Sequence, residues 1–201
     1  MPTQARKFGW DTNAPRGPVS TLVLGLVLYG FFLYLFIEAA DYFSKVEPLR
    51  RVSMGMFVVD WMFLYVHEGG HFLFSFFGRT LAILGGSFWQ VMFPLLSFVL
   101  AVRDTPRIAP VPLYFTGYNL MSVSHYMLDA PMRKLHLLGG DKRGHDWHNL
   151  FNTWGVMAYS DTIAGITYWP GWVCCVGAIV AGIFFGLQDY WKPNSFQRSN
   201  Q

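Results

Sequence analysis

The sequence predicts an all-α membrane protein whose chain crosses the bilayer roughly five times. Of its 201 residues, 53% are hydrophobic and only 13% are charged, whereas soluble domains carry about 25% charged residues. Apolar stretches long enough to span the hydrocarbon layer as helices recur along the chain. The formal net charge is only +3, with no basic cluster of the kind that binds nucleic acid. We therefore expect one multi-pass integral membrane domain over residues 1–201, in contact with lipid and without a nucleic-acid partner.

The first two expected crossings follow a polar leader. Residues 1–17 are polar, and no small-residue cleavage site of a secretory signal follows the first apolar run. That run, residues 20–40, is therefore expected to remain as the first membrane helix. A polar connection over 41–51 leads to the second expected helix, over 52–77. This helix is apolar on nearly all sides, so its few polar residues need a function or partners.

The third apolar stretch contains residues that disfavour a straight helix. Gly85, Gly86 and Ser87 are followed by Gln90 and Pro94. These residues predict a broken or re-entrant segment around residues 80–100, and a helix kinked at the proline is the alternative. Irregular backbone at membrane depth is tolerated where it lines a wet cavity, so we expect such a cavity here.

The rest of the chain alternates between apolar and polar segments. The last expected crossing is bent near Pro170 and contains Cys174 and Cys175, which we expect to be buried thiols rather than a disulfide. The segments are an apolar helix over 113–128, a polar connection over 130–148, a semi-apolar interfacial stretch over 150–159, a crossing over 162–187 and a polar tail over 188–201.

The most informative motif is His67-Glu68-Gly69-Gly70-His71, an HExxH sequence inside the second apolar segment. Residues i and i+4 share one face of a helix, so both imidazoles can give a nitrogen to a single Zn²⁺. Glu68 lies one step round the helix, where its carboxylate can take a proton from an activated water molecule. A pair of hydrogen-bonded histidines inside a bundle is the alternative. The apolar surroundings favour metal binding, because polar groups without a partner are unfavourable at membrane depth.

A catalytic zinc site needs a third protein ligand besides His67 and His71. All three glutamates lie at or before the motif, so an aspartate or a histidine downstream is expected. Asp129, which closes the apolar segment 113–128, is the leading candidate, and an interfacial carboxylate without a ligand role is the alternative. His125 lies four residues earlier on the same helix face, where it is expected to hydrogen-bond Asp129 or to replace it.

Other polar residues are candidates for supporting roles. Gln90 and Asn119 stand in apolar segments, and we expect them to contact the metal ligands or the substrate. Asp60 precedes His67 by two turns on the same face and is a candidate partner for it, although an interfacial aspartate is an equal alternative. A second cluster, His145 to His148, has a spacing that could hold a metal or orient a substrate, with a solvated loop as the simpler interpretation.

An HExxH motif in an apolar helix, followed by a Leu128-Asp129 pair that ends another, resembles the site-2 protease family of intramembrane zinc metalloproteases. The resemblance covers about residues 52–130 and is that of a divergent member. Ala130 stands where the family usually has glycine after the aspartate, and no PDZ-like domain is present.

This resemblance implies a function and a ligand set. His67, His71 and Asp129 would bind zinc, and Glu68 would activate water to hydrolyse peptide bonds in membrane-embedded segments of a substrate protein. The segment from Gly85 to Gln90 would offer an edge for the unwound substrate.

Two other classes of function remain open from the sequence. One is a non-catalytic membrane subunit of a larger complex, with a structural or vestigial metal site. The other, less favoured, is a membrane di-iron oxygenase or desaturase. Those enzymes generally need about eight clustered histidines, and this chain has six.

Overall fold

The computed structural model describes residues 19–47, 51–135 and 142–191, and the regular structure in these ranges is entirely helical. The polar leader over 1–17 and the part of the tail beyond residue 191 lie outside the described residues. The α-helices are α1 (Val19–Phe43), α2 (Met54–Phe74), α3 (Arg79–Asp104), α4 (Pro110–Leu128), α5 (Asp146–Trp154) and α6 (Ser160–Trp191), with short 3₁₀ turns over Ser75–Phe77, Lys142–Gly144 and Met157–Tyr159.

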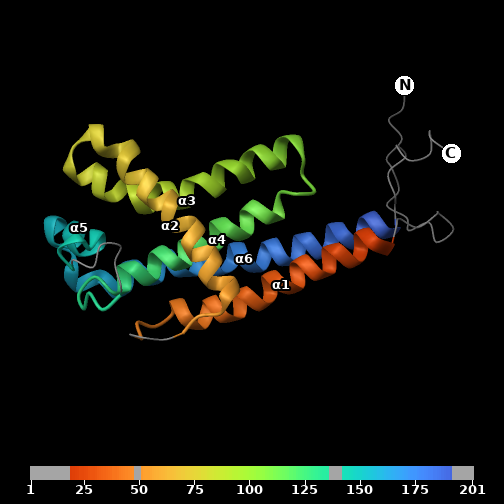
Figure 1. Ribbon diagram of the computed structural model, residues 1–201, viewed down its shortest axis with the longest axis horizontal. Coiled ribbons are helices and arrows are strands. Elements are labelled where there is room, and N and C mark those ends of the chain that lie inside the picture. The colour runs from red at the N-terminus through yellow and green to blue at the C-terminus, as the bar shows by residue number, and fades with distance from the viewer. Residues whose placement is uncertain (1–18, 48–50, 136–141, 192–201) are drawn as a thin grey trace, which may run out of the picture.

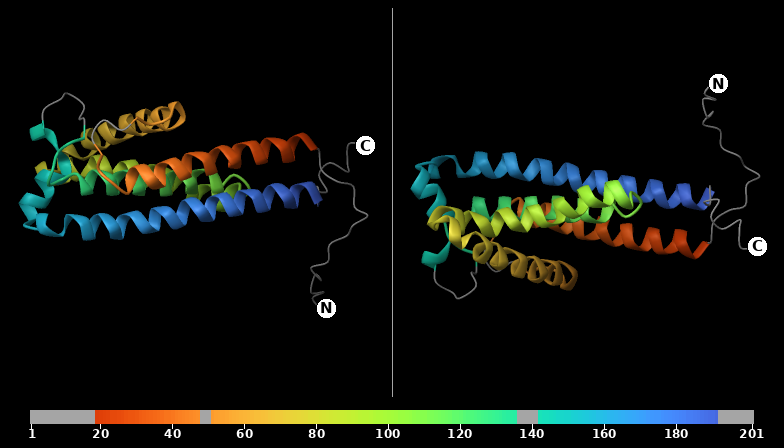
Figure 2. Two further views of the ribbon diagram at one scale, coloured as in Figure 1. Left: turned by 90° about the horizontal axis from the view of Figure 1, so that it is seen from below. Right: turned by 90° about the horizontal axis from the view of Figure 1, so that it is seen from above.

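Three long helices form the body of the molecule. Helices α1, α4 and α6 run side by side along the longest axis, and α3 packs beside α4 (Figures 1 and 2). Helix α2 lies obliquely to them and packs mainly against α3. Helix α5 lies at one end, opposite the end at which α1 begins and α6 finishes. The carboxyl end of α2 and the start of α5 are thus brought to the same end of the bundle.

Local sequence signals explain where several helices begin and end. The Ser53 side chain caps α2 by accepting a hydrogen bond from the Met56 amide at 3.2 Å. Gly78 has a φ of 93° in the turn between α2 and α3, and Gly155 has a φ of 70° at the end of α5. Only glycine adopts this left-handed region without strain. Pro110 occupies the first position of α4, where its missing N–H needs no partner.

Two glycine contacts bring helices close together. A Cβ atom on Gly70 of α2 would lie 2.3 Å from the Gly85 carbonyl oxygen of α3. A Cβ atom on Gly117 of α4 would lie 2.5 Å from the Gly171 carbonyl oxygen of α6. Small residues let helix backbones approach in this way. Both pairs therefore fix the distance between the helices that surround the polar end of the bundle.

Helix α3 corrects the expectation of a broken or re-entrant segment around residues 80–100. It is one α-helix from Arg79 to Asp104 that runs through the glycine pair and Pro94. Gly86, Gln90 and Pro94 are spaced by four residues, and all three are buried, so they share one inward face. The small residues serve close packing against α2 rather than a break in the helix. The expected edge for a substrate strand between Gly85 and Gln90 is therefore wrong.

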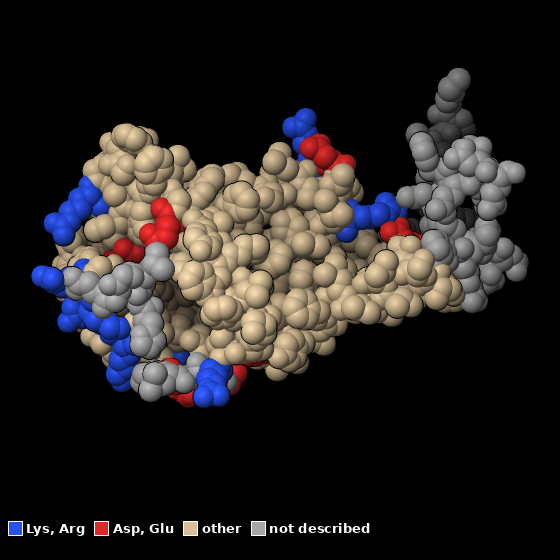
Figure 3. Space-filling view, viewed as in Figure 1, with Lys and Arg blue, Asp and Glu red and all other residues tan. Residues whose placement is uncertain are grey.

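The outer surface has the composition of a membrane protein. Three helical segments in the described part of the chain are long and apolar enough to cross a bilayer: Val19–Phe43, Arg79–Asp104 and Met157–Trp191. In the view of Figure 3, charged side chains gather towards the two ends and the surface between them is uncharged. The expected count of five crossings is not confirmed, because α2 and α4 are not among these three segments.

Candidate metal centre

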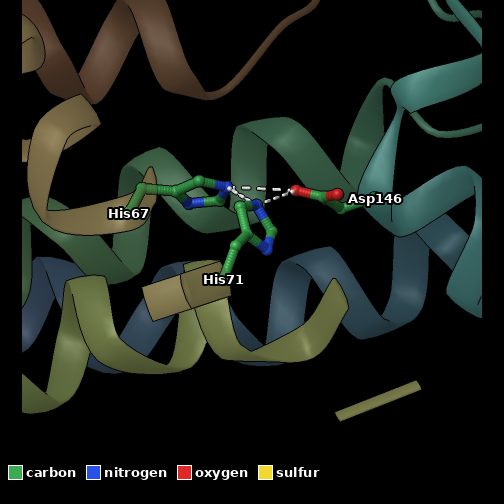
Figure 4. Close-up of side chains that lie close together, drawn as sticks. All are labelled: His67, His71 and Asp146. Atoms are coloured by element: carbon green, nitrogen blue, oxygen red, sulfur yellow. Dashed lines mark hydrogen bonds and ion pairs between the residues drawn. The ribbon is translucent and has the colours of Figure 1, made fainter. Parts of the chain in front are cut away.

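Two histidines and an aspartate form a compact group at the α5 end of the bundle. His67 and His71 project from α2 towards Asp146, the first residue of α5 (Figure 4). The Nε2 atoms of the two histidines lie 3.0 Å apart, and Asp146 Oδ2 lies 3.0 Å from one and 3.2 Å from the other. Three potential ligand atoms thus converge on one point.

Hydrogen bonds behind His67 determine which of its nitrogens faces this point. Asn119 Nδ2 donates to the Phe115 carbonyl oxygen at 2.7 Å, so its Oδ1 faces Gln90 and accepts from Gln90 Nε2 at 2.9 Å. Gln90 Oε1 must then accept, at 2.9 Å, a hydrogen from His67 Nδ1. This series of hydrogen bonds, which begins at the Phe115 carbonyl oxygen, places the hydrogen of a neutral His67 imidazole on Nδ1 and its lone pair on Nε2.

His71 is oriented in the same sense by the backbone of α3. Its Nδ1 donates to the Ala82 carbonyl oxygen at 2.8 Å, which leaves the lone pair on Nε2. Metal-binding histidines usually donate their other ring N–H to a carbonyl or carboxylate in this way. Both imidazoles lie over Gly86, where a Cβ atom would lie 2.6 Å from each Nε2. The site thus depends on a residue without a side chain.

Asp146 reaches the histidines because the end of α4 holds the start of α5. The His145 ring packs against the Tyr126 ring at a tilt, with 4.3 Å between ring centroids, and the Tyr126 hydroxyl oxygen accepts a hydrogen bond from the Asp146 amide at 3.0 Å. Burial raises the pKa of the Asp146 carboxyl, and hydrogen bonds and positive charge from His67 and His71 in their protonated form lower it by more. Its pKa therefore lies below the ordinary value, and the carboxyl is an anion at neutral pH.

Asp129, the expected third ligand, does not belong to this group. Its side chain is fully buried, and both carboxylate oxygens accept hydrogen bonds elsewhere. Oδ1 accepts from the Lys134 amide at 2.8 Å, and Oδ2 accepts from the Leu135 amide at 3.0 Å and from His145 Nε2 at 3.2 Å. Burial raises the pKa of Asp129 and these donors lower it by more, to a net fall. Asp129 therefore anchors the chain that leads towards α5. Asp146, which takes the place expected for Asp129, lies outside the range 52–130 of the resemblance.

The remaining candidates have separate places. Gln90 and Asn119 support His67, as described above. His125 is 4% exposed, packs against Tyr42 and Phe43, and makes no hydrogen bond of ordinary geometry with other described residues. It contacts neither Asp129 nor the histidine pair through a hydrogen bond.

Asp60 and His148 also have partners of their own. Asp60 accepts a hydrogen bond from the Tyr118 hydroxyl at 2.7 Å rather than from His67. His148 donates from Nδ1 to the Ala130 carbonyl oxygen at 2.8 Å, and its Nε2 accepts from Asn152 Nδ2 at 2.9 Å. The cluster from His145 to His148 therefore supplies one member of the group, Asp146, while its histidines hold the local structure.

A cavity of about 600 Å³ opens onto this group. His67, Glu68, His71 and Asp146 line one part of it, and aromatic side chains that include Phe57 and Trp61 line another. Glu68 is half-buried beside the two histidines. A further carboxylate, a set of potential ligand atoms and a cavity thus meet in one place.

Comparison of this chain with protein-family models, with curated proteins and with solved structures finds no match.

Proposed function

We propose that this chain is a membrane-embedded zinc hydrolase that cleaves peptide bonds in apolar segments of other proteins. The observation that carries the proposal is the group of His67 Nε2, His71 Nε2 and Asp146 Oδ2 beside Glu68. In their neutral form both imidazoles present a lone pair to the same point, because their Nδ1 atoms donate to other groups.

The distances within the group fit zinc. Ligand atoms around a tetrahedral Zn²⁺, with bonds of about 2.0–2.1 Å, lie about 3.3 Å apart. The three distances here are 3.0–3.2 Å, so small movements would suffice to accommodate the ion. Two neutral imidazoles and one carboxylate are also a ligand set that zinc hydrolases use. Two lone pairs and an anion this close repel one another unless a cation or proton lies between them.

The surroundings favour a catalytic site over a structural one. Structural zinc sites generally have four protein ligands, whereas catalytic sites have three and a position for water. Here three side chains meet at the edge of a cavity with a further carboxylate, Glu68, beside them. This difference supports the hydrolase over the alternative of a subunit with a structural metal.

The chain's own residues can carry out the proton transfers of hydrolysis. When bound, zinc would acidify a water molecule and polarise the carbonyl group of the scissile bond. Glu68 would accept a proton as the water oxygen bonds to the carbonyl carbon, and would pass that proton to the amide nitrogen as the C–N bond breaks. The products are a carboxylic acid and an amine, so Glu68 returns to its starting form. His67, His71 and Asp146 would hold the ion throughout.

The apolar walls suggest the class of substrate. Phe57, Trp61 and Leu64 of α2 line the same cavity as the polar group, and the outer faces of α2 and α3 expose many apolar side chains. A membrane protein segment, locally unwound so that its carbonyl groups are accessible, fits such a cavity. We propose that α2 and α4 also lie within the bilayer, which would make five crossings in total.

A substitution of the proposed base tests the function. Purified wild-type protein and Glu68→Gln would be loaded with zinc and incubated in detergent with apolar peptides of about 20 residues, the length of a membrane span. Mass spectrometry would identify the cleaved bonds. We expect equal zinc content and a rate lowered by about 10²–10⁴-fold in the variant. Equal cleavage by both proteins would contradict the proposal.

A further inference from the structure

Tyr126, in the last turn of α4, has a hydroxyl group whose hydrogen is not donated to any of the described residues. In the described part of the chain this hydroxyl makes one hydrogen bond, in which its oxygen accepts from the Asp146 amide at 3.0 Å. A tyrosine hydroxyl can accept and donate at the same time. Its own hydrogen is therefore available to a ligand.

The position of this hydroxyl is fixed by its neighbours. The Tyr126 ring packs against the His145 ring in a tilted contact, with 4.3 Å between centroids and an angle of 34° between planes. Its other neighbour is His67, at 6.2 Å between centroids and 63°. The ring lies among the same groups that surround the cavity, and Tyr126 itself lines it together with His67, Glu68, His71 and Asp146.

The hydrogen bond from Asp146 strengthens Tyr126 as a donor. The Asp146 amide is one of the N–H groups at the start of α5 that have no partner within the helix, where the helix dipole is positive. A hydroxyl that accepts from such a group becomes polarised and donates more strongly in turn. The bond also fixes the phenol oxygen next to the residue whose Oδ2 belongs to the ligand group.

We propose that Tyr126 is a further catalytic residue, which donates a hydrogen bond to the carbonyl oxygen of the bound substrate. This inference rests on the proposed hydrolase function. The carbonyl oxygen gains negative charge as water adds to the carbon, so a fixed donor beside it stabilises the transition state more than the substrate. Glu68 accepts a proton from water, and Tyr126 donates a hydrogen bond to the carbonyl oxygen of the substrate, which becomes negative.

The test uses a metal with visible absorption and a small probe, so that it does not depend on turnover. Wild-type protein and Tyr126→Phe would be saturated with Co²⁺ and titrated with acetohydroxamate, whose carbonyl oxygen resembles that of the substrate. Tyr114→Phe is the matched control, because Tyr114 is a buried tyrosine of the same helix that donates to the Phe32 carbonyl oxygen away from the cavity.

We expect all three proteins to take up one equivalent of Co²⁺, and Tyr126→Phe alone to bind acetohydroxamate about tenfold more weakly. Equal acetohydroxamate affinity in Tyr126→Phe and wild type would overturn the role of Tyr126 and leave the metal centre intact. Loss of Co²⁺ uptake in Tyr126→Phe would also overturn it, since Tyr126 would then act by holding Asp146. Failure of wild-type protein to bind Co²⁺ would refute the metal centre and this role with it.

Discussion

The Gly86→Ala variant should lose metal binding while the helices remain in place. A Cβ atom at residue 86 would lie 2.6 Å from His67 Nε2, 2.6 Å from His71 Nε2 and 2.5 Å from His71 Cε1. Restoring an ordinary contact of 3.4 Å would require the rings to move by about 0.8 Å. The helix itself accepts alanine readily, because alanine has a higher helix propensity than glycine.

A movement of this size is large for a metal site. Metal–ligand distances in zinc sites vary by only about 0.2 Å, and even loss of a group that hydrogen-bonds a ligand typically lowers metal affinity by about 10–100-fold. Both rings are also held from behind, His67 by Gln90 and His71 by the Ala82 carbonyl oxygen, so neither can retreat without losing a hydrogen bond. We therefore expect at least a hundredfold loss of zinc affinity in Gly86→Ala.

Zinc affinity would be measured by competition with a chromogenic chelator. Gly69→Ala is the matched control, because residue 69 is also in a helix, next to the site in sequence, and a Cβ there meets no atom within 4 Å. Thermal unfolding of both variants in the same detergent would show whether the bundle is intact. A Gly86→Ala protein that binds zinc as tightly as wild type would refute the geometry described here.

The remaining predictions concern residues that support the site. Gln90→Leu should lower zinc affinity by about 10–100-fold, because His67 Nδ1 loses its hydrogen-bond acceptor. Helix content measured by circular dichroism should change little. Unchanged zinc affinity would show that the hydrogen bond from His67 to Gln90 has no role in metal binding. Asp129→Asn should keep its zinc but lower the free energy of unfolding by about 1–3 kcal/mol, because the amide cannot accept all three hydrogen bonds; full stability in denaturant titrations would disprove the anchoring role. The pKa of Asp129 is lower in the folded protein than in the unfolded chain, where it is about 4, so the carboxylate stabilises the fold fully above about pH 4. The difference in unfolding free energy between wild type and Asp129→Asn should therefore shrink as the pH falls below about 4.

Most of the helical architecture could be predicted from the apolar runs, because their length and composition allow few alternatives. One exception is α5, which begins at Asp146, inside the expected polar connection over 130–148. Another is α3, where Gly85, Gly86 and Pro94 predict a break. All three residues are instead buried within one continuous helix, and that is a property of the packed bundle rather than of local propensity. The position of α2, oblique to the other helices, has no signal in the sequence that we can identify.

The local part of the site could be predicted, and the distant part could not. His67 and His71 lie four residues apart, so helical geometry alone brings their rings together. Asp146 lies 75 residues or more beyond them, and only the fold brings it near. The His145–His148 cluster does indicate a possible metal site, but the position of Asp129 at the end of the apolar segment 113–128 favours Asp129 as the ligand. Tyr126 carried no signal, since an aromatic residue in an apolar segment is usually part of a core.

The most direct measurement of the central claim is the zinc content of two aspartate variants, purified in parallel with wild type and analysed by plasma mass spectrometry. If His67, His71 and Asp146 hold the ion, wild type and Asp129→Asn should each contain one zinc per chain, and Asp146→Asn should contain much less. Zinc retained by Asp146→Asn but lost from Asp129→Asn, or no zinc in wild type, would contradict it.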